Sequence, residues 1–304
     1  VKFSYLFIIA SLVYFVPIMK KVQTGQVIEF YSNSCQVKTD FGKFLCLAIE
    51  NIVVGDFVEL EIIQDSKNLK GKILKVLKRK SKLSKLVRKK NKLFAANISH
   101  VGIIVSPKPK ISTEFIDKWI LKSKFSNIKT FLINNKIDTK QNEEYRNKLN
   151  IYKHINIDII DCSAKYGNNI KELINFIKNK CILFVGNSGA GKSTLTSKLI
   201  GKELKVNALS NNQGVHTTSI SSLFEIQNNT KIIDSPGMRD IDISNYPKEQ
   251  IINGFDEIQN AAKYCKFSDC NHINNQGCYV KESLVNGQIS QRRYNNFIKF
   301  RDYE

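Results

Sequence analysis

The clearest chemistry in this chain lies in residues 186–193, which read Gly-Asn-Ser-Gly-Ala-Gly-Lys-Ser. The glycines let backbone N–H groups turn toward phosphate oxygens, and a helix beginning just after the loop adds the positive end of its dipole. In such a loop Lys192 reaches the β- and γ-phosphates, and the Ser193 hydroxyl ligates Mg²⁺. The pattern predicts a nucleoside triphosphate site made by Gly186, Asn187, Ser188, Gly189, Ala190, Gly191, Lys192, Ser193 and Thr194.

Two further motifs indicate the base. Residues 135–138 read Asn-Lys-Ile-Asp and follow an apolar run. The Asp138 carboxylate can accept hydrogen bonds from both N1–H and the exocyclic amine of guanine, two donors that adenine does not offer together. We expect Asn135 to contact O6 and the stem of Lys136 to cover the ring. The predicted guanine site comprises Asn135, Lys136, Ile137 and Asp138, supported through backbone contacts by Ser163, Ala164 and Lys165.

A third group of residues would act around the γ-phosphate and the magnesium ion. The polar segment 211–219 carries Thr218, which we expect to ligate Mg²⁺ together with Ser193. Another apolar run ends in Asp-Ser-Pro-Gly at 234–237. There Asp234 would hold a magnesium-bound water, and the N–H of Gly237 would touch the γ-phosphate.

His216 is the candidate catalytic residue. The position after Gly237, where many GTPases carry a water-orienting glutamine, is Met238, whose thioether cannot orient a water. We therefore expect slow unassisted hydrolysis, with His216 orienting or polarising the water once a partner orders its segment. The alternative is that His216 only packs or contacts RNA. Full stimulated turnover in His216→Ala would contradict the catalytic role.

Three cysteines and one histidine cluster near the C-terminus as Cys265, Cys270, His272 and Cys278. Thiolates and an imidazole suit tetrahedral zinc, and four protein ligands leave no position open for water. We therefore expect a structural Zn²⁺ that stabilises a unit too small to build much core. The other four cysteines stand singly in apolar surroundings, which favours a reducing compartment.

The elements that position these motifs alternate from residue 98 onward. Apolar runs predict buried strands at 101–105, 130–134, 157–161, 181–185 and 230–233, and helical spacing predicts helices at 113–123, 170–179 and 194–200. This alternation is typical of an α/β fold with a parallel sheet. The guanine motif precedes the phosphate loop, whereas in most GTPases it follows. We therefore predict a circularly permuted P-loop GTPase domain.

The N-terminal part predicts a separate β structure followed by a basic stretch. Alternating runs predict strands at 25–30, 34–39, 43–48, 57–62 and 71–77. They suit a small closed barrel of the oligonucleotide-binding (OB) type, or another small sheet. Thirteen lysines and arginines then lie between Lys67 and Lys92 with no acidic residue among them. This stretch favours a surface that contacts RNA phosphates over a solvated linker.

The length of 304 residues allows two or three domains, and the hydrophobic content of 42% is typical of globular proteins. The formal charge is +20. We expect a barrel and basic linker at 19–95, the GTPase domain at 96–255 and an α-helical zinc-binding domain at 256–304. Residues 1–18 form an apolar leader that we expect to be an over-extended start, because Met19 and two lysines make a natural beginning. An intact-mass measurement showing that the native protein begins before Met19 would contradict this.

On these residues the chain resembles the ribosome small subunit-dependent GTPase A family over residues 19–304. The marks are the order of motifs 135–138 and 186–193, Gly-Val-His-Thr-Thr at 214–218 and the spacing of the four zinc ligands. The departures are the leader and Ser99, where the family usually has an acidic residue. The resemblance implies an N-terminal OB-fold, a permuted GTPase domain and a C-terminal zinc knuckle.

The resemblance also implies a function. It implies a GTPase that binds the small ribosomal subunit and its rRNA, assists late maturation and is stimulated by that subunit. We expect a cytoplasmic monomer without stable membrane association. One rival is a GTP-gated RNA-binding scaffold with negligible hydrolysis, which subunits would not stimulate. Another is an ATP-driven enzyme, which would bind ATP and GTP equally and leave Asp138 without a role.

Overall fold

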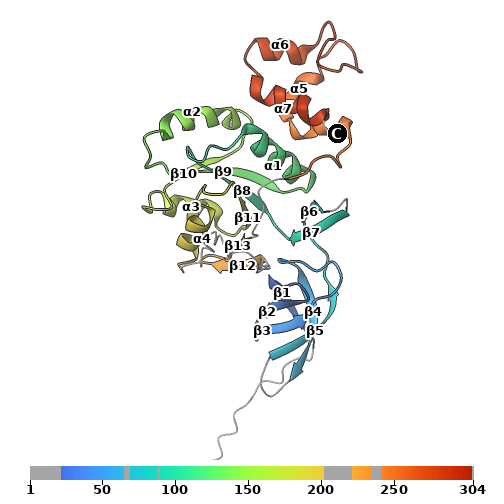
Figure 1. The fold of residues 1–304 in the computed structure, drawn as a ribbon. Helices are drawn as coiled ribbons and strands as arrows, with labels where there is room; N and C mark the ends of the chain where they lie inside the picture. The colour runs from blue at the N-terminus through green and yellow to red at the C-terminus, as the bar shows by residue number, and fades with distance from the viewer. Residues whose placement is uncertain (1–21, 65–68, 88–89, 202–220, 235–240, 303–304) are drawn as a thin grey trace, which may run out of the picture.

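The computed structural model describes residues 22–64, 69–87, 90–201, 221–234 and 241–302. Within these ranges Figure 1 shows a β-barrel at the bottom, a central α/β layer and a helical C-terminal unit at the top. The barrel and the central layer share one hydrogen-bonded sheet, whose described strands follow the order β10-β9-β8-β11-β13-β12-β1-β2-β3-β5-β4. The leader 1–18 lies outside the described residues.

The barrel consists of β1 (Val22–Phe30), β2 (Ser34–Thr39), β3 (Gly42–Leu47), β4 (Phe57–Gln64) and β5 (Leu69–Val76). β1 pairs with both β2 and β4, and β3 pairs with β5, so these strands close into a ring. Side chains alternate across each strand, and Val37, Phe44 and Leu60 are fully buried in the core of the ring. The closed ring confirms the predicted barrel.

The central layer carries the long apolar runs as parallel strands. These are β8 (His100–Val105), β9 (Lys129–Asn135), β10 (Ile159–Cys162), β11 (Cys181–Val185) and β13 (Thr230–Asp234), with β12 (Ser221–Ile226) antiparallel to β13. Strands covered on both faces are apolar at successive positions, and residues 182–185 of β11 are fully buried. β12 also pairs with β1 and so joins this layer to the barrel.

Four helices cover the parallel strands. They are α1 (Thr113–Phe125), α2 (Asn142–Lys153), α3 (Ile170–Ile177) and α4 (Lys192–Ile200). Figure 1 shows α1 and α2 on one face of the sheet and α3 and α4 on the other. The guanine-motif strand β9 precedes the phosphate-loop strand β11 in the chain, yet both flank β8 in the sheet. This arrangement confirms the circularly permuted P-loop GTPase fold.

The basic stretch contains a β-hairpin that we did not predict. β6 (Lys82–Val87) pairs with β7 (Lys90–Ala96) as a separate small sheet. Leu83 is fully buried, whereas Lys82 beside it is exposed. The hairpin base is held to the barrel because Ala96 N donates to Val54 O at 3.0 Å.

The C-terminal unit is helical. It contains the 3₁₀ helix η1 (Lys248–Gly254) and the helices α5 (Asp256–Ala262), α6 (Tyr279–Val285) and α7 (Gln291–Arg301). Three phenylalanines pack together inside it: the ring centroid of Phe255 lies 5.6 Å from that of Phe297 and 5.9 Å from that of Phe300. In the part of the chain that the structure describes, no helix combines the length and the apolar character that a membrane crossing requires.

Candidate guanine-nucleotide and metal sites

The phosphate loop joins β11 to α4 at the carboxyl ends of the parallel strands. Gly186 passes close to β8, because a Cβ on it would lie 2.7 Å from Ile104 O. Gly191 has a φ of +96° and leaves no room for a side chain, since a Cβ there would lie 2.2 Å from Asn135 Nδ2. Gly186 and Gly191 are therefore required by the backbones and side chains around them.

Asn135 ties the three predicted nucleotide motifs together. Its side chain is buried, its Nδ2 donates to Ala190 O at 2.9 Å, and its Oδ1 accepts from Ala164 N at 2.9 Å. We expected this side chain to contact guanine O6. The structure directs it to the backbone of the two neighbouring loops, because β9 lies between β10, which leads into residues 163–165, and β8, which pairs with the phosphate-loop strand. The contact with guanine O6 stays a prediction. Asn135 thus fixes the loops relative to each other.

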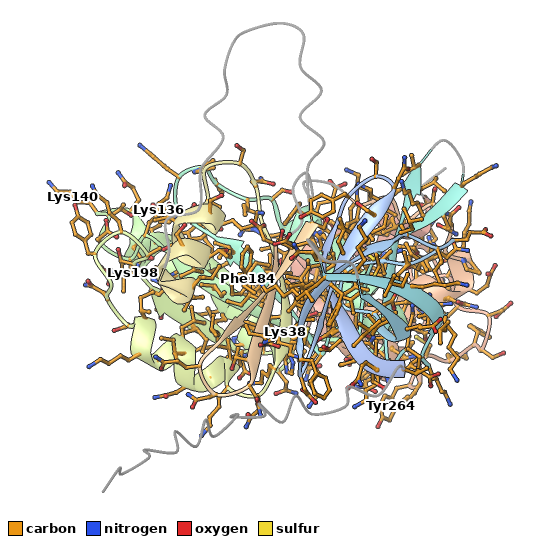
Figure 2. All side chains as sticks on the ribbon, turned by 90° about the horizontal axis from the view of Figure 1, so that it is seen from below. Lys38, Lys136, Lys140, Phe184, Lys198 and Tyr264 are labelled. Atoms are coloured by element: carbon orange, nitrogen blue, oxygen red, sulfur yellow. The ribbon has the colours of Figure 1, made fainter. Side chains whose placement is uncertain are left out.

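The remaining guanine-motif residues line the outer side of this junction. Lys136 Nζ donates to Lys108 O at 2.5 Å and to Gly189 O at 2.7 Å, so its stem crosses the phosphate loop. The Ser163 hydroxyl donates to Asp138 Oδ1 at 2.5 Å, while Asp138 itself is exposed. Figure 2 shows Lys136 on the same side of the molecule as Lys140 and Lys198. Asp138 is thus oriented by a neighbouring loop and open to a base.

Lys192 and Asp234 meet at the phosphate end of the site. Lys192 Nζ donates to Asp234 Oδ1 as an ion pair between α4 and the end of β13. Two functional side chains predicted from separate motifs are thus adjacent. The other predicted residues near the γ-phosphate, His216, Thr218 and Gly237, lie outside the described residues.

A polar network behind the guanine motif was missed by the sequence analysis. Asn134 Nδ2 donates to Asn142 Oδ1 and to Asp161 Oδ1, both at 2.8 Å, and Arg146 Nε donates to Asp161 Oδ2 at 2.8 Å. These residues connect β9, β10 and α2 next to the guanine motif. No short motif marks them, although Asn134 and Asp161 stand one residue before buried strand ends.

The four predicted metal ligands converge in the C-terminal unit. One potential ligand atom from each of Cys265, Cys270, His272 and Cys278 lies within 4.8 Å of all the others. His272 Nδ1 is 3.6 Å from Cys265 Sγ and 3.7 Å from Cys278 Sγ. This donor set and spacing fit a tetrahedral ion such as Zn²⁺. The hydroxyl of Tyr294, which lies on α7, donates to His272 O at 2.6 Å and so attaches the segment that carries His272 to this helix.

The ionisation of the ligands also fits a metal site. Burial lowers the pKa of His272, with a further contribution from Arg301, which keeps the imidazole neutral. Burial would raise the pKa of Cys265, but hydrogen bonds with the N–H groups of Val280 and Tyr279 and with the Cys270 and Cys278 side chains together lower that pKa. Burial raises the pKa of Cys278 to about 11. A bound cation would favour the thiolate form there.

A buried ion-pair network joins the metal unit to the GTPase layer. Arg293 of α7 is fully buried, and its Nη1 donates to Asp117 Oδ1 of α1 at 2.7 Å. Its Nε donates to Glu257 Oε1 at 2.7 Å, and Asn296 Nδ2 donates to Asp117 Oδ2 at 2.6 Å. α1 follows the loop that contains Lys108, so the metal unit is anchored on a helix adjacent to the nucleotide loops.

Comparisons with known proteins agree with this architecture. The family model described as RsgA GTPase matches residues 76–244. The chain is 31% identical over 292 residues to the small ribosomal subunit biogenesis GTPase RsgA of Actinobacillus pleuropneumoniae, covering 91% of this chain and 84% of the relative. It is 33% identical over 292 residues to the protein of the same name from Flavobacterium psychrophilum, covering 91% and 88%.

Solved structures give the same result. The crystal structure of YjeQ from Thermotoga maritima matches with a TM-score of 0.73 and 30% identity, covering 92% of this chain and 97% of that one. YloQ, described as a circularly permuted GTPase, matches in fold with a TM-score of 0.69 and 19% identity, covering 92% and 94%. With the permuted sheet, the joined nucleotide motifs and these matches, the chain belongs to the RsgA GTPase family.

Proposed function

We propose that this protein is a GTP hydrolase that binds the small ribosomal subunit and assists its late maturation. The observation that carries the proposal is the pair of hydrogen bonds that the Asn135 side chain makes with the backbone of Ala190 and Ala164. These bonds hold the guanine motifs and the phosphate loop together. Membership of the RsgA family supports the ribosomal partner. The same membership supports a cytoplasmic place of action, and we propose a monomer.

The site residues divide the work of binding. We propose that Asp138 accepts hydrogen bonds from guanine, that residues 163–165 support the base, and that Lys136 covers the ring. Residues 186–194 and Gly237 would surround the phosphates. On GTP binding Lys192 would leave Asp234 for the phosphates, which frees that carboxylate for the metal shell.

Mg²⁺ and Zn²⁺ are the proposed cofactors. Ser193, Thr218 and Asp234 would hold Mg²⁺, which supplies charge neutralisation at the phosphates. Cys265, Cys270, His272 and Cys278 would hold a structural Zn²⁺. Metal analysis of purified protein should give one zinc per chain, with loss in Cys270→Ser and retention in Cys181→Ser. Retention in both variants would contradict the ligand assignment.

Catalysis would depend on a partner. We propose that His216 orients the attacking water when the small subunit orders its segment, because Met238 offers no suitable hydrogen-bonding group. The test is GTP turnover by the full chain alone, with purified small subunits, and with free rRNA. The proposal is supported if small subunits stimulate GTP turnover and Lys192→Ala abolishes that stimulation. Equal turnover with and without subunits would contradict the proposal and favour the alternative, a GTP-gated RNA-binding scaffold.

A further inference from the structure

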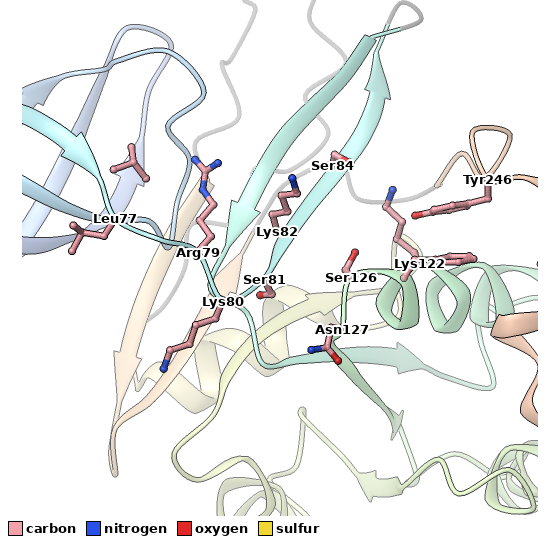
Figure 3. Close-up of a pocket in the computed structure, with 12 residues that line it drawn as sticks. Leu77, Arg79, Lys80, Ser81, Lys82, Ser84, Lys122, Ser126, Asn127 and Tyr246 are labelled. Atoms are coloured by element: carbon pink, nitrogen blue, oxygen red, sulfur yellow. The ribbon is translucent and has the colours of Figure 1, made fainter. Parts of the chain in front are cut away.

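A pocket of about 680 Å³ lies between the basic hairpin and the far end of α1. Its walls come from two parts of the chain, as the close-up in Figure 3 shows. One is the start of the basic hairpin and the segment before it, and the other is the end of α1 with the residues after it and Tyr246. The lining residues are Val76, Leu77, Arg79, Lys80, Ser81, Lys82, Ser84, Lys122, Phe125, Ser126, Asn127 and Tyr246. None of the described residues that line it belongs to the predicted guanine, phosphate or zinc sets. The volume falls in the range of pockets that hold small ligands.

The position of the pocket separates it from the nucleotide site. The loop before α1 contacts the guanine motif, because Lys136 Nζ donates to Lys108 O. The pocket lies at the opposite end of α1, where Lys122 and Phe125 line it. A helix of 13 residues is about 20 Å long, so the two sites are roughly one helix length apart.

Lys122 is the unusual residue of the pocket wall. It is 7% exposed, and no ion pair to it is found among the described residues. Its ammonium lies 5.2 Å from the ring centroid of Tyr246. Burial lowers its pKa, and Asp242 opposes this only by a longer-range charge interaction. A buried cation is costly unless an anion is bonded to it, and an anionic ligand in the pocket would supply one.

The other side of the pocket adds exposed cations and hydroxyl groups. Lys80 and Lys82 are exposed, and Figure 3 shows the Lys82 ammonium on the hairpin side, facing the wall that carries Lys122. Arg79 also lines the pocket, but it is already paired with Asp56, at 2.6 Å from Nε to Oδ1. Ser84 and Ser126 supply hydroxyl donors. These groups are suited to a phosphate.

An aromatic surface completes the pocket. The rings of Phe125 and Tyr246 are stacked, with centroids 4.3 Å apart and planes at 16°. Tyr246 is only partly buried, so part of its ring or edge is available to a ligand. A planar base can stack on such a ring. The combination of cations, hydroxyls and a ring is the chemistry that recognises a nucleoside phosphate.

We infer that this pocket is a second binding site, for a nucleoside phosphate group, distinct from the guanine-nucleotide site. The phosphate would lie between Lys82 and Lys122, and the base would lie against Tyr246. The ligand is either a free mononucleotide or one nucleotide of a single-stranded RNA. The inference does not depend on GTP hydrolysis, because it uses none of the residues of that site.

The test measures binding to the full chain with GDP and Mg²⁺ saturating the guanine site. The probes are adenosine 5′-monophosphate and a uridine tetranucleotide. Calorimetry and fluorescence titration measure the binding of each probe. Binding of the mononucleotide identifies a free ligand, and binding of the tetranucleotide alone identifies an RNA strand. Binding of neither at millimolar concentration would overturn the inference.

Variants place the binding in the pocket. Lys82→Ala and Lys122→Met should each weaken binding about tenfold, because each removes a charge-assisted contact to phosphate. Tyr246→Phe should retain the base contact and bind nearly normally. Lys153→Ala removes an exposed lysine on α2 and is the matched control. A loss in Lys153→Ala equal to that in Lys82→Ala would show general charge attraction and would also overturn the inference.

Thermal unfolding of each variant separates a local effect from a folding defect. Lys82 is exposed, so its replacement should leave the unfolding midpoint unchanged. GTP turnover by Lys82→Ala without subunits should equal that of the natural chain. The proposed hydrolytic function can therefore fail or succeed independently of the second site.

Discussion

We propose that the base preference of the nucleotide site depends on Asp138. Its carboxylate is exposed and oriented by the Ser163 hydroxyl at 2.5 Å. An amide at this position would keep an acceptor for N1–H but replace the second acceptor by a donor. Xanthine has a carbonyl where guanine has its amine, so a donor there suits xanthine.

Asp138→Asn should therefore weaken GTP binding about 100-fold and strengthen xanthosine triphosphate binding. Competition titrations with both nucleotides measure the change. Asp158→Asn is the control: Asp158 is an exposed acid just before β10, and its replacement should alter neither affinity. Unchanged GTP binding in Asp138→Asn would refute its role in reading the base.

Gly191 tests the junction between the phosphate loop and Asn135. Gly191→Ala should weaken GDP and GTP binding by at least about tenfold, because its Cβ would lie 2.2 Å from Asn135 Nδ2. Gly201 also has a positive φ, +70°, but nothing lies within 4 Å of a Cβ there. Gly201→Ala should cost stability of about 1 kcal/mol and leave nucleotide binding intact. Equal binding losses in the two variants would show that backbone strain, not the contact with Asn135, limits the loop.

Between elements, α7 and α1 are linked by one buried and one exposed ion pair. Arg293 and Asp117 are fully buried and joined at 2.7 Å, whereas Lys299 and Glu114 form a partly exposed pair across the same contact. Removal of one partner from a buried pair leaves the other charge unpaired in a low dielectric. An exposed pair is screened by solvent and contributes little.

Arg293→Met should therefore lower the free energy of unfolding by about 3–5 kcal/mol, and Lys299→Ala by less than about 1 kcal/mol. Urea unfolding followed by circular dichroism measures both. Adding Asp117→Leu to Arg293→Met should recover part of the loss, because the fully buried Asp117 carboxylate is then no longer left unpaired and only the less buried Glu257 lacks its partner. Equal small losses in the two single variants would mean that α7 is held by its aromatic contacts alone.

At the scale of the whole molecule, positive charge is concentrated between the barrel and the GTPase layer. Lys90 and Lys92 are exposed on β7 of the hairpin. If this surface contacts RNA phosphates, each contact releases counterions, so affinity falls as salt rises.

Affinity for small ribosomal subunits should fall steeply with salt concentration. The slope of log affinity against log salt should decrease by about 0.7–0.9 for each lysine–phosphate interaction that Lys90→Ala or Lys92→Ala removes. Lys171→Ala on α3 removes the same charge far along the chain and should leave the slope unchanged. A uniform change in all three variants would indicate only net charge.

Periodicity predicted the barrel strands and the buried parallel strands well and the charged elements poorly. β11 and β13 are continuous apolar runs, because both faces of the sheet are covered. α2 went unpredicted, because its buried residues Tyr145, Leu149 and Tyr152 form a narrow stripe among charged residues. The hairpin of β6 and β7 went unpredicted for the same reason, since lysines occupy its solvent-facing positions.

The sequence by itself determined the nucleotide motifs, the order that reveals permutation and the four candidate metal ligands, because each is encoded in closely spaced residues. Only the tertiary structure decided that Asn135 bonds to Ala190 and Ala164 and that Arg293 meets Asp117, 176 residues away. It also decided that Lys122 faces the hairpin across a pocket. Such contacts depend on strand order and helix packing, which bring together residues whose local sequences carry no mark of each other.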